Sequence, residues 1–159
     1  MMQEPQAKNG FQAAHAELLA MSFQRLLQRP LLEGATAQAL YQAPFPILSH
    51  DGAADPVLTY GNLAAQALWE MPWEKLTSMP SRLTAEPAHR DQRDAMFAEM
   101  RQKGVIENYA GVRISATGKR FEIQNAVIWT LFDAQGQKCG EAACFHRWQV
   151  LQSTPATGL

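Results

Sequence analysis

Apolar residues recur at helical spacing between residues 11 and 28. One stripe holds Phe11, Ala14, Leu18 and Met21, and a second stripe beside it holds Leu19, Phe23, Leu26 and Leu27. Pro30 ends the pattern, because proline cannot continue a helix. The two stripes form a wider arc than a single docking face needs. We predict that residues 11–28 pack on the domain and also form a homodimer; the alternative is one broad intramolecular face.

The middle of the chain alternates short strands with short helices. A short helix is predicted over 35–41, and strands over 45–49 and 57–60 flank a turn rich in Asp, Gly and Pro, which is typical of a hairpin. Asn62 stands where a helix N-cap belongs, and Pro72 ends that helix. A second short helix is expected over 73–78, and Pro87 begins a longer one that ends at Gly104.

The last third of the chain has the two-residue period of strands. Residues 105–115, 120–132 and 139–151 are predicted to form an antiparallel meander with turns at Thr117-Gly118 and Asp133 to Gly136. Together with the hairpin they give an α+β fold: a five-stranded antiparallel sheet with helices on one face, preceded by the N-terminal amphipathic helix. Such a sheet curves around its helices and can leave a cavity.

The facing of residues 120–132 decides which side chains reach that cavity. One face carries Phe121, Ile123, Asn125, Val127, Trp129 and Leu131, and the other carries Glu122, Gln124, Ala126, Ile128, Thr130 and Phe132. We predict that the first set points inward, although a single β-bulge would exchange the two sets. An inward Asn125 would orient a ligand or bond an adjacent strand or a water molecule, since an unpaired buried amide is costly.

Arg113 lies between Val112 and Ile114 in a strand. A guanidinium there could hold a carboxylate or a phosphate through two parallel hydrogen bonds, or it could be an exposed residue of the outer face. The tryptophans outside the last strands, Trp69 and Trp73, are expected to anchor the core or a pocket. The candidate ligand-binding residues are Tyr60, Trp69, Phe97, Arg113, Asn125, Trp129 and Phe145.

Composition narrows the class of protein. The chain has 159 residues, 47% of them apolar, and a net charge of −1, which fits one folded domain and gives no electrostatic reason to expect nucleic acid. No apolar run is long enough to span a membrane, and no signal peptide is recognisable. Cys139 and Cys144 match no zinc spacing, so we expect no metal and a reducing cytoplasm. Residues 1–10 and 152–159 are predicted to be disordered tails.

Catalytic patterns are not found. The sequence contains no phosphate-binding loop, nucleophile elbow or dinucleotide fingerprint, and its four histidines are scattered. His50 and Asp51 are neighbours, and neighbours in a strand point to opposite faces. Apolar residues flank Cys144, which favours a buried, inert thiol over a nucleophile. We therefore predict that the protein is not an enzyme.

Several segments resemble PAS domains. They are Ile47 to Asp51, Pro56 to Ala65 with a tyrosine ending the strand and Asn62 beginning the helix, Trp73 to Leu76, and Glu86 to Asp91. Within that superfamily, residues 40–151 are most similar to the MEKHLA domain, through Ser81 to Pro87, Gly111 to Ser115, Ala126-Val127 with Trp129, and Phe145 to Trp148. The six-letter motif of the family name is absent, as are a homeodomain and a zipper, so DNA binding is not transferred.

The resemblance implies a sensory or interaction domain and names no ligand. Flavin photochemistry of the light-sensing type needs a cysteine in an Asn-Cys-Arg motif on a central helix, and haem needs a suitably placed imidazole, whereas His89 opens the long helix. Neither cofactor is expected. We predict a small-molecule-binding module that signals through a homodimer or a separate effector protein. The alternative is a protein interaction domain with a filled core.

Overall fold

The computed structural model describes residues 2–85, 95, 98–100 and 102–151. Six antiparallel strands form one sheet in the order β2-β1-β5-β4-β3, with β6 also paired to β4. The strands are β1 (Ile47–Asp51), β2 (Leu58–Gly61), β3 (Val105–Ile114), β4 (Arg120–Phe132), β5 (Lys138–Cys144) and β6 (Arg147–Val150). The helices are η1 (Ala7–Asn9), α1 (Ala13–Leu27), α2 (Ala37–Tyr41), α3 (Leu63–Trp69), α4 (Trp73–Leu76) and η2 (Ser81–Thr84).

The predicted α+β fold is confirmed, and the bounds of β4 match the prediction. The predicted last strand is divided into β5 and β6, because Phe145 and His146 interrupt it where the ring of His146 stacks on Phe45 at 3.9 Å between centroids. The predicted helix from Pro87 to Gly104 lies mostly outside the described residues, as does the predicted tail over 152–159.

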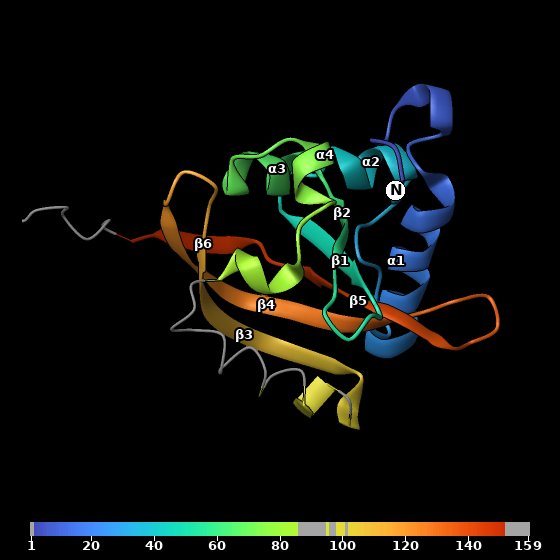
Figure 1. Ribbon diagram of the computed structural model, residues 1–159. Coiled ribbons are helices and arrows are strands. Elements are labelled where there is room, and N and C mark those ends of the chain that lie inside the picture. The colour runs from blue at the N-terminus through green and yellow to red at the C-terminus, as the bar shows by residue number, and fades with distance from the viewer. Residues whose placement is uncertain (1, 86–94, 96–97, 101, 152–159) are drawn as a thin grey trace, which may run out of the picture.

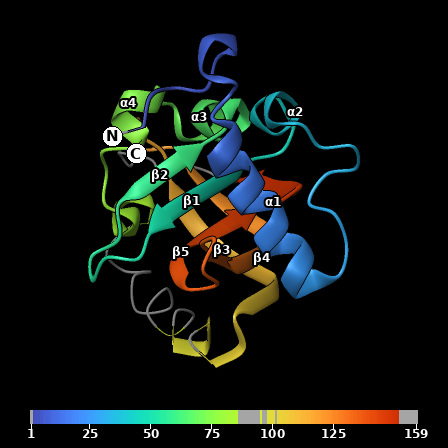
Figure 2. The same ribbon diagram turned by 90° about the vertical axis from the view of Figure 1, so that its right-hand side faces the viewer.

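The sheet is covered on both faces (Figures 1 and 2). On one face α1 crosses the strands, and its Leu19 and Phe23 pack in a core cluster with Trp129 and Leu131. The other face carries a second core cluster that includes Trp69 of α3 and Phe121 of β4. The helix at the N-terminus therefore covers the opposite side of the sheet from α3 and η2, so that a single strand contributes to two cores.

Two β-bulges occur side by side in β3 and β4. Asn108 and Asn125 both have left-handed backbone, with φ of 58° and 52°. The first bulge adds a residue to β3 between Ile106 and Tyr109, and the second adds a residue to β4 between Ile123 and Ala126. Each bulge exchanges the two faces of its own strand. Because both strands gain one residue, they have the same register before and after the pair of bulges.

The bulge at Asn125 corrects the predicted facing of β4. Asn125 is exposed instead of pointing inward. Before it, Phe121 and Ile123 face the α3 side; after it, Ala126 and Ile128 do so, and the predicted inward residues Val127, Trp129 and Leu131 face α1. A prediction from strict alternation fails at this position, because the extra residue of a bulge moves all later side chains of the strand to the opposite face.

The N-terminal segment also differs from the prediction. Residues 2–10 are ordered: Met2 accepts a hydrogen bond of 2.9 Å from the indole of Trp73, and the Glu4 carboxylate accepts one from the Tyr41 hydroxyl. These partners offset the entropy lost in ordering a polar segment. No disordered tail is present over residues 2–10.

The predicted N-cap at Asn62 is confirmed and has a second role. Its fully buried amide accepts hydrogen bonds from the Ala65 and Ile47 amides and donates to the carbonyl oxygens of Leu40 and Phe45. One side chain thus caps α3 and ties it to the start of β1 and the end of α2. All the hydrogen-bonding capacity of the amide is used.

Candidate ligand-binding pocket

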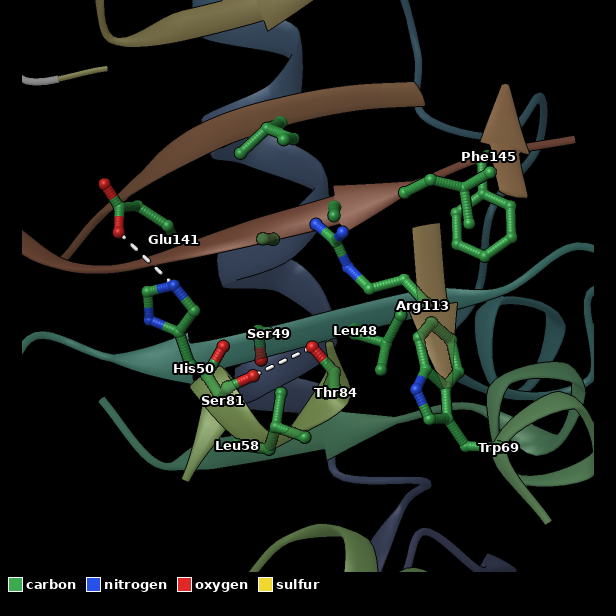
Figure 3. A pocket seen from close by; sticks show the side chains of 14 residues that line it. Leu48, Ser49, His50, Leu58, Trp69, Ser81, Thr84, Arg113, Glu141 and Phe145 are labelled. Carbon is green, nitrogen blue, oxygen red and sulfur yellow. Dashed lines mark hydrogen bonds and ion pairs between the residues drawn. The ribbon is translucent and has the colours of Figure 1, made fainter. Parts of the chain in front are cut away.

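A pocket lies between the sheet and the segment that contains η2, on the face opposite α1 (Figure 3). Its free volume is about 70 Å³. The apolar lining includes Leu48, Leu58, Trp69, Ile123, Ile128 and Phe145, and the polar lining includes His50, Ser81, Thr84, Arg113 and Glu141. The pocket is therefore an apolar space into which a few polar groups converge, as in many ligand sites.

Arg113 is the buried cation of this pocket. It lies in β3, only 7% of its surface is exposed, and its guanidinium points into the pocket on the side of His50 and Glu141 (Figure 3). The guanidinium donates to the Val112 carbonyl oxygen at 2.9 Å and to the Tyr109 hydroxyl at 3.2 Å. No carboxylate among the described residues pairs with it, although a buried charge normally has such a partner.

Trp69 supplies a second donor. Its indole is 2% exposed, and its Nε1 has no hydrogen-bond partner within the part of the chain that the structure describes. The ring packs edge-on against Phe121 and Phe145, and its nitrogen lies on the side that faces Leu58 and Thr84 (Figure 3). An unpaired buried N–H group costs free energy, so this wall of the pocket offers an unused donor.

An ion-paired group forms the opposite end. Nε2 of His50 lies 3.3 Å from Oε1 of Glu141, and the Lys138 ammonium lies 3.1 Å from Oε2 of the same carboxylate. Nδ1 of His50 lies 2.8 Å from the carbonyl oxygen of Asp51. The charge of Glu141 is thus balanced by Lys138 of β5, which leaves Arg113 as the lining charge without an oppositely charged partner among the described residues.

Three of the seven predicted site residues meet in this pocket: Trp69, Arg113 and Phe145. Asn125 is not among them, because the bulge exposes it. Phe97 lies outside the described residues. The sequence analysis did not identify His50, Glu141, Ser81 and Thr84 as lining residues. A signal existed for two of them: His50 directly follows the predicted strand 45–49, and Glu141 is an acidic residue within the predicted strand 139–151.

Tyr60 and Trp129 belong to the other face of the sheet. The Trp129 indole donates to the Leu19 carbonyl oxygen of α1 at 3.2 Å, and its ring meets Phe23 edge-on. The Tyr60 ring stacks on His15 of α1 at 5.4 Å, and burial raises the pKa of its hydroxyl well above the usual value. Both residues therefore hold α1 against the sheet instead of lining the pocket.

The cysteines also lie away from the pocket. Cys144 packs in the cluster beneath α1, and burial raises the pKa of its thiol to about 12. Cys139 is partly buried against the same cluster, and its pKa is raised as well, mainly by burial. Neither is a reactive thiolate at neutral pH. The described residues contain no group of His, Cys, Asp or Glu able to hold a metal ion, and none of their helices is long and apolar enough to cross a membrane.

Comparison with known proteins gives a family and a fold. The model of the MEKHLA domain family matches residues 13–150, which include α1. No curated protein sequence matches. The similar solved structures include an RNA-binding light-oxygen-voltage receptor, 16% identical, with a TM-score of 0.60. This chain covers 32% of that receptor, which in turn matches 72% of this chain.

Two further structures agree with this fold. A PAS domain from Colwellia psychrerythraea is 13% identical, with a TM-score of 0.60, over 69% of this chain and 91% of that one. The blue-light photoreceptor Vivid is 11% identical, with a TM-score of 0.54, over 65% and 78%. At these identities the likeness concerns the fold, and it supports the PAS-like architecture expected from the sequence.

Proposed function

The chain belongs to the MEKHLA domain family, and we propose that it is a non-enzymatic sensory module that binds a small molecule in the pocket between the sheet and η2. The observation that carries this proposal is Arg113, a buried guanidinium directed into an apolar pocket with no acid partner among the described residues. Keeping such a charge away from water is costly unless an anion compensates it. Two reduced cysteines agree with a cytoplasmic location.

The signal would leave through α1, which lies on the other side of the sheet. Strand β4 lines the pocket with Ile123 and Ile128 and supports α1 with Trp129. A shift of β4 on ligand binding therefore moves the surface on which α1 packs. The recipient is a second copy of the chain or a separate effector protein, and we favour a homodimer through residues 11–28.

Met21 allows a test of the dimer. Its side chain on α1 is 63% exposed, whereas Leu19 and Phe23 are buried against the sheet. Met21→Glu should convert a dimer into a monomer in sedimentation velocity, because a charge in an apolar interface is costly. Ala54→Glu, an equal change of charge at an exposed position of the turn between β1 and β2, outside residues 11–28, is the control. A wild-type monomer, or a dimer unchanged by Met21→Glu, would exclude this interface.

A protein interaction domain with a filled core is the alternative function. The free volume of about 70 Å³ favours it over a large ligand, since drug-sized molecules occupy pockets of roughly 300 Å³ or more. The same volume, and cysteines that lie on the α1 side, do not fit a flavin. One similar structure concerns a flavin analogue in a light-oxygen-voltage domain, so a flavin is nevertheless a defined outcome of the test below.

Native mass spectrometry of the protein purified from its own source tests the proposal. A mass above the denatured mass, with release of one small molecule, supports the binding module and identifies the ligand. A yellow, flavin-sized adduct would identify a photosensor and refute our assignment of a small ligand. A bare protein whose melting temperature responds to no metabolite would favour the interaction domain.

A further inference from the structure

The pocket carries enough chemistry to define the class of its ligand, provided that the proposed binding function holds. We infer that the ligand is a short-chain monocarboxylic acid with a second, uncharged acceptor oxygen, such as a hydroxy or oxo acid. The carboxylate binds Arg113, the second oxygen accepts from Nε1 of Trp69, and the carbon chain contacts the apolar lining.

The charge of the pocket selects a monoanion. A guanidinium has five N–H donors, and two protein acceptors, Val112 and Tyr109, use only part of that capacity. The remaining fork matches the two oxygens of a carboxylate. One guanidinium compensates one negative charge, so a phosphate dianion would leave a second buried charge without a partner and is disfavoured.

The second acceptor follows from Trp69. Two buried donor groups from separate elements line one pocket: Trp69 of α3, whose Nε1 has no acceptor among the described residues, and Arg113 of β3, whose guanidinium has only neutral acceptors there. A plain fatty acid whose two carboxylate oxygens both face the Arg113 guanidinium leaves Nε1 of Trp69 unpaired. An acid whose chain also carries a hydroxyl or a carbonyl oxygen satisfies both, which leaves no buried N–H of Trp69 unpaired.

Size and polarity limit the rest of the molecule. A free volume of about 70 Å³ leaves room for only a few carbon atoms. The remaining lining near Arg113 consists largely of Leu48, Ile123, Phe145 and the indole of Trp69. A short apolar chain fits these walls, whereas an amino acid would bury an ammonium group beside an existing cation.

Isothermal titration with a defined set of probes tests the inference. We expect 2-hydroxybutyrate to bind more tightly than butyrate, and butyramide and inorganic phosphate not to bind. Arg113→Met should weaken binding of 2-hydroxybutyrate roughly 30-fold or more, since it removes a charged hydrogen-bonding partner. Arg147→Met, the same change at an exposed arginine of β6, should leave binding unchanged.

Two further measurements separate ligand recognition from a structural role. Without ligand, Arg113→Met should melt no lower than the wild type, because replacing an uncompensated buried charge by an apolar side chain relieves its desolvation cost. Trp69→Phe should reduce the preference for 2-hydroxybutyrate over butyrate and leave the affinity for butyrate itself nearly unchanged.

The possible outcomes distinguish the two levels of the argument. Equal binding of butyramide, binding of phosphate alone, or full binding by Arg113→Met would overturn the acid assignment. If native mass spectrometry then finds a neutral or cationic molecule in the protein, the binding function stands without the acid. If no probe binds and the purified protein is bare, both the acid assignment and the proposed function fail.

Discussion

The guanidinium of Arg113 donates a hydrogen bond of 3.2 Å to the hydroxyl of Tyr109, four residues earlier in the same strand. Gly111 lies between them and makes this contact possible, because a Cβ at that position would come within 2.6 Å of the Tyr109 hydroxyl and 3.0 Å of the guanidinium. The guanidinium also lies over the Tyr109 ring, 5.6 Å from its centroid. Tyr109 is therefore the residue that positions Arg113.

Removing the Tyr109 hydroxyl should loosen this arrangement. In Tyr109→Phe we expect the Kd for 2-hydroxybutyrate to rise about 5-fold, since one hydrogen bond to a charged group is lost while the ring remains. Titration calorimetry measures the change, and an unaltered melting temperature confirms that the fold is intact. An unchanged Kd would show that Arg113 needs no such support.

Asn62→Ala should be strongly destabilising. It removes the buried side-chain partner of two backbone amides and two carbonyl oxygens, although the Leu40 oxygen keeps a bond of 3.4 Å from the Ala43 amide, and we expect a loss of about 3 kcal/mol in the free energy of unfolding. Thr36→Ala removes the exposed N-cap of α2, which makes one such bond, and should cost about 1 kcal/mol. Urea denaturation compares the two, and similar losses would contradict the fourfold role of Asn62.

The bulge at Asn125 can be tested with two substitutions at one position. Its φ of 52° is accessible to glycine at no steric cost and is strained for a β-branched residue. Asn125→Gly should therefore leave the free energy of unfolding within about 0.5 kcal/mol of the wild type, and Asn125→Val should lower it by about 1 to 2 kcal/mol. If valine were tolerated as well as glycine, the left-handed backbone at this position would be wrong.

Gly140 marks a close approach of β1 and β5. A Cβ there would overlap the backbone carbonyl oxygen of His50, which no rotation of a side chain can relieve. We expect Gly140→Ala to cost more than about 3 kcal/mol or to prevent folding. At Gly52, which directly follows β1, the nearest atom would be 3.5 Å away, so Gly52→Ala should have little effect on thermal unfolding.

His15 should make stability depend on pH. Burial lowers its pKa to about 4, compared with 6.5 in the unfolded chain. The unfolded chain therefore binds more protons in this range, and stability falls as the pH drops from about 6.5 towards 4. At pH 5 the loss is about 2 kcal/mol, at roughly 1.4 kcal/mol per pKa unit.

A neutral replacement isolates this effect from the other histidines. His15→Gln removes the titrating group, so its urea midpoint should change less than that of the wild type between pH 7.5 and pH 5.0. Equal changes in the two proteins would show that His15 does not control the acid sensitivity. The hydrogen bond of 2.9 Å between Nε2 and the Ser49 hydroxyl explains any loss common to both pH values.

The sequence allowed most elements to be predicted, because their limits are set locally. Pro30, Pro72 and Asn62 act through their own backbone or side chain, and each ended or began a helix as expected. The direction in which the β4 side chains point could not be predicted in this way, because it is not set by local sequence. It depends on how Asn125 and its neighbours pair with β3, and this is why Trp129 was predicted in the pocket but lies under α1.

Arg113 shows the complementary case. The sequence left open whether it faces a ligand or the solvent, since both fit an alternating strand. The bulge at Asn108 decides the matter by turning Tyr109, Gly111 and Arg113 to the same side as Phe121 and Ile123. His50 and Glu141 were missed because they come from strands that only tertiary pairing brings together.

The paired bulges also constrain how this domain can change in length. Ile106 stays opposite Ile128 and Arg113 opposite Phe121 only because β3 and β4 each carry one extra residue at nearly the same level. A deletion in one strand alone would turn half of that strand inside out, whereas matched deletions in both would preserve the pairing. Family members without the extra residue in one of these strands should therefore be missing it in the other as well.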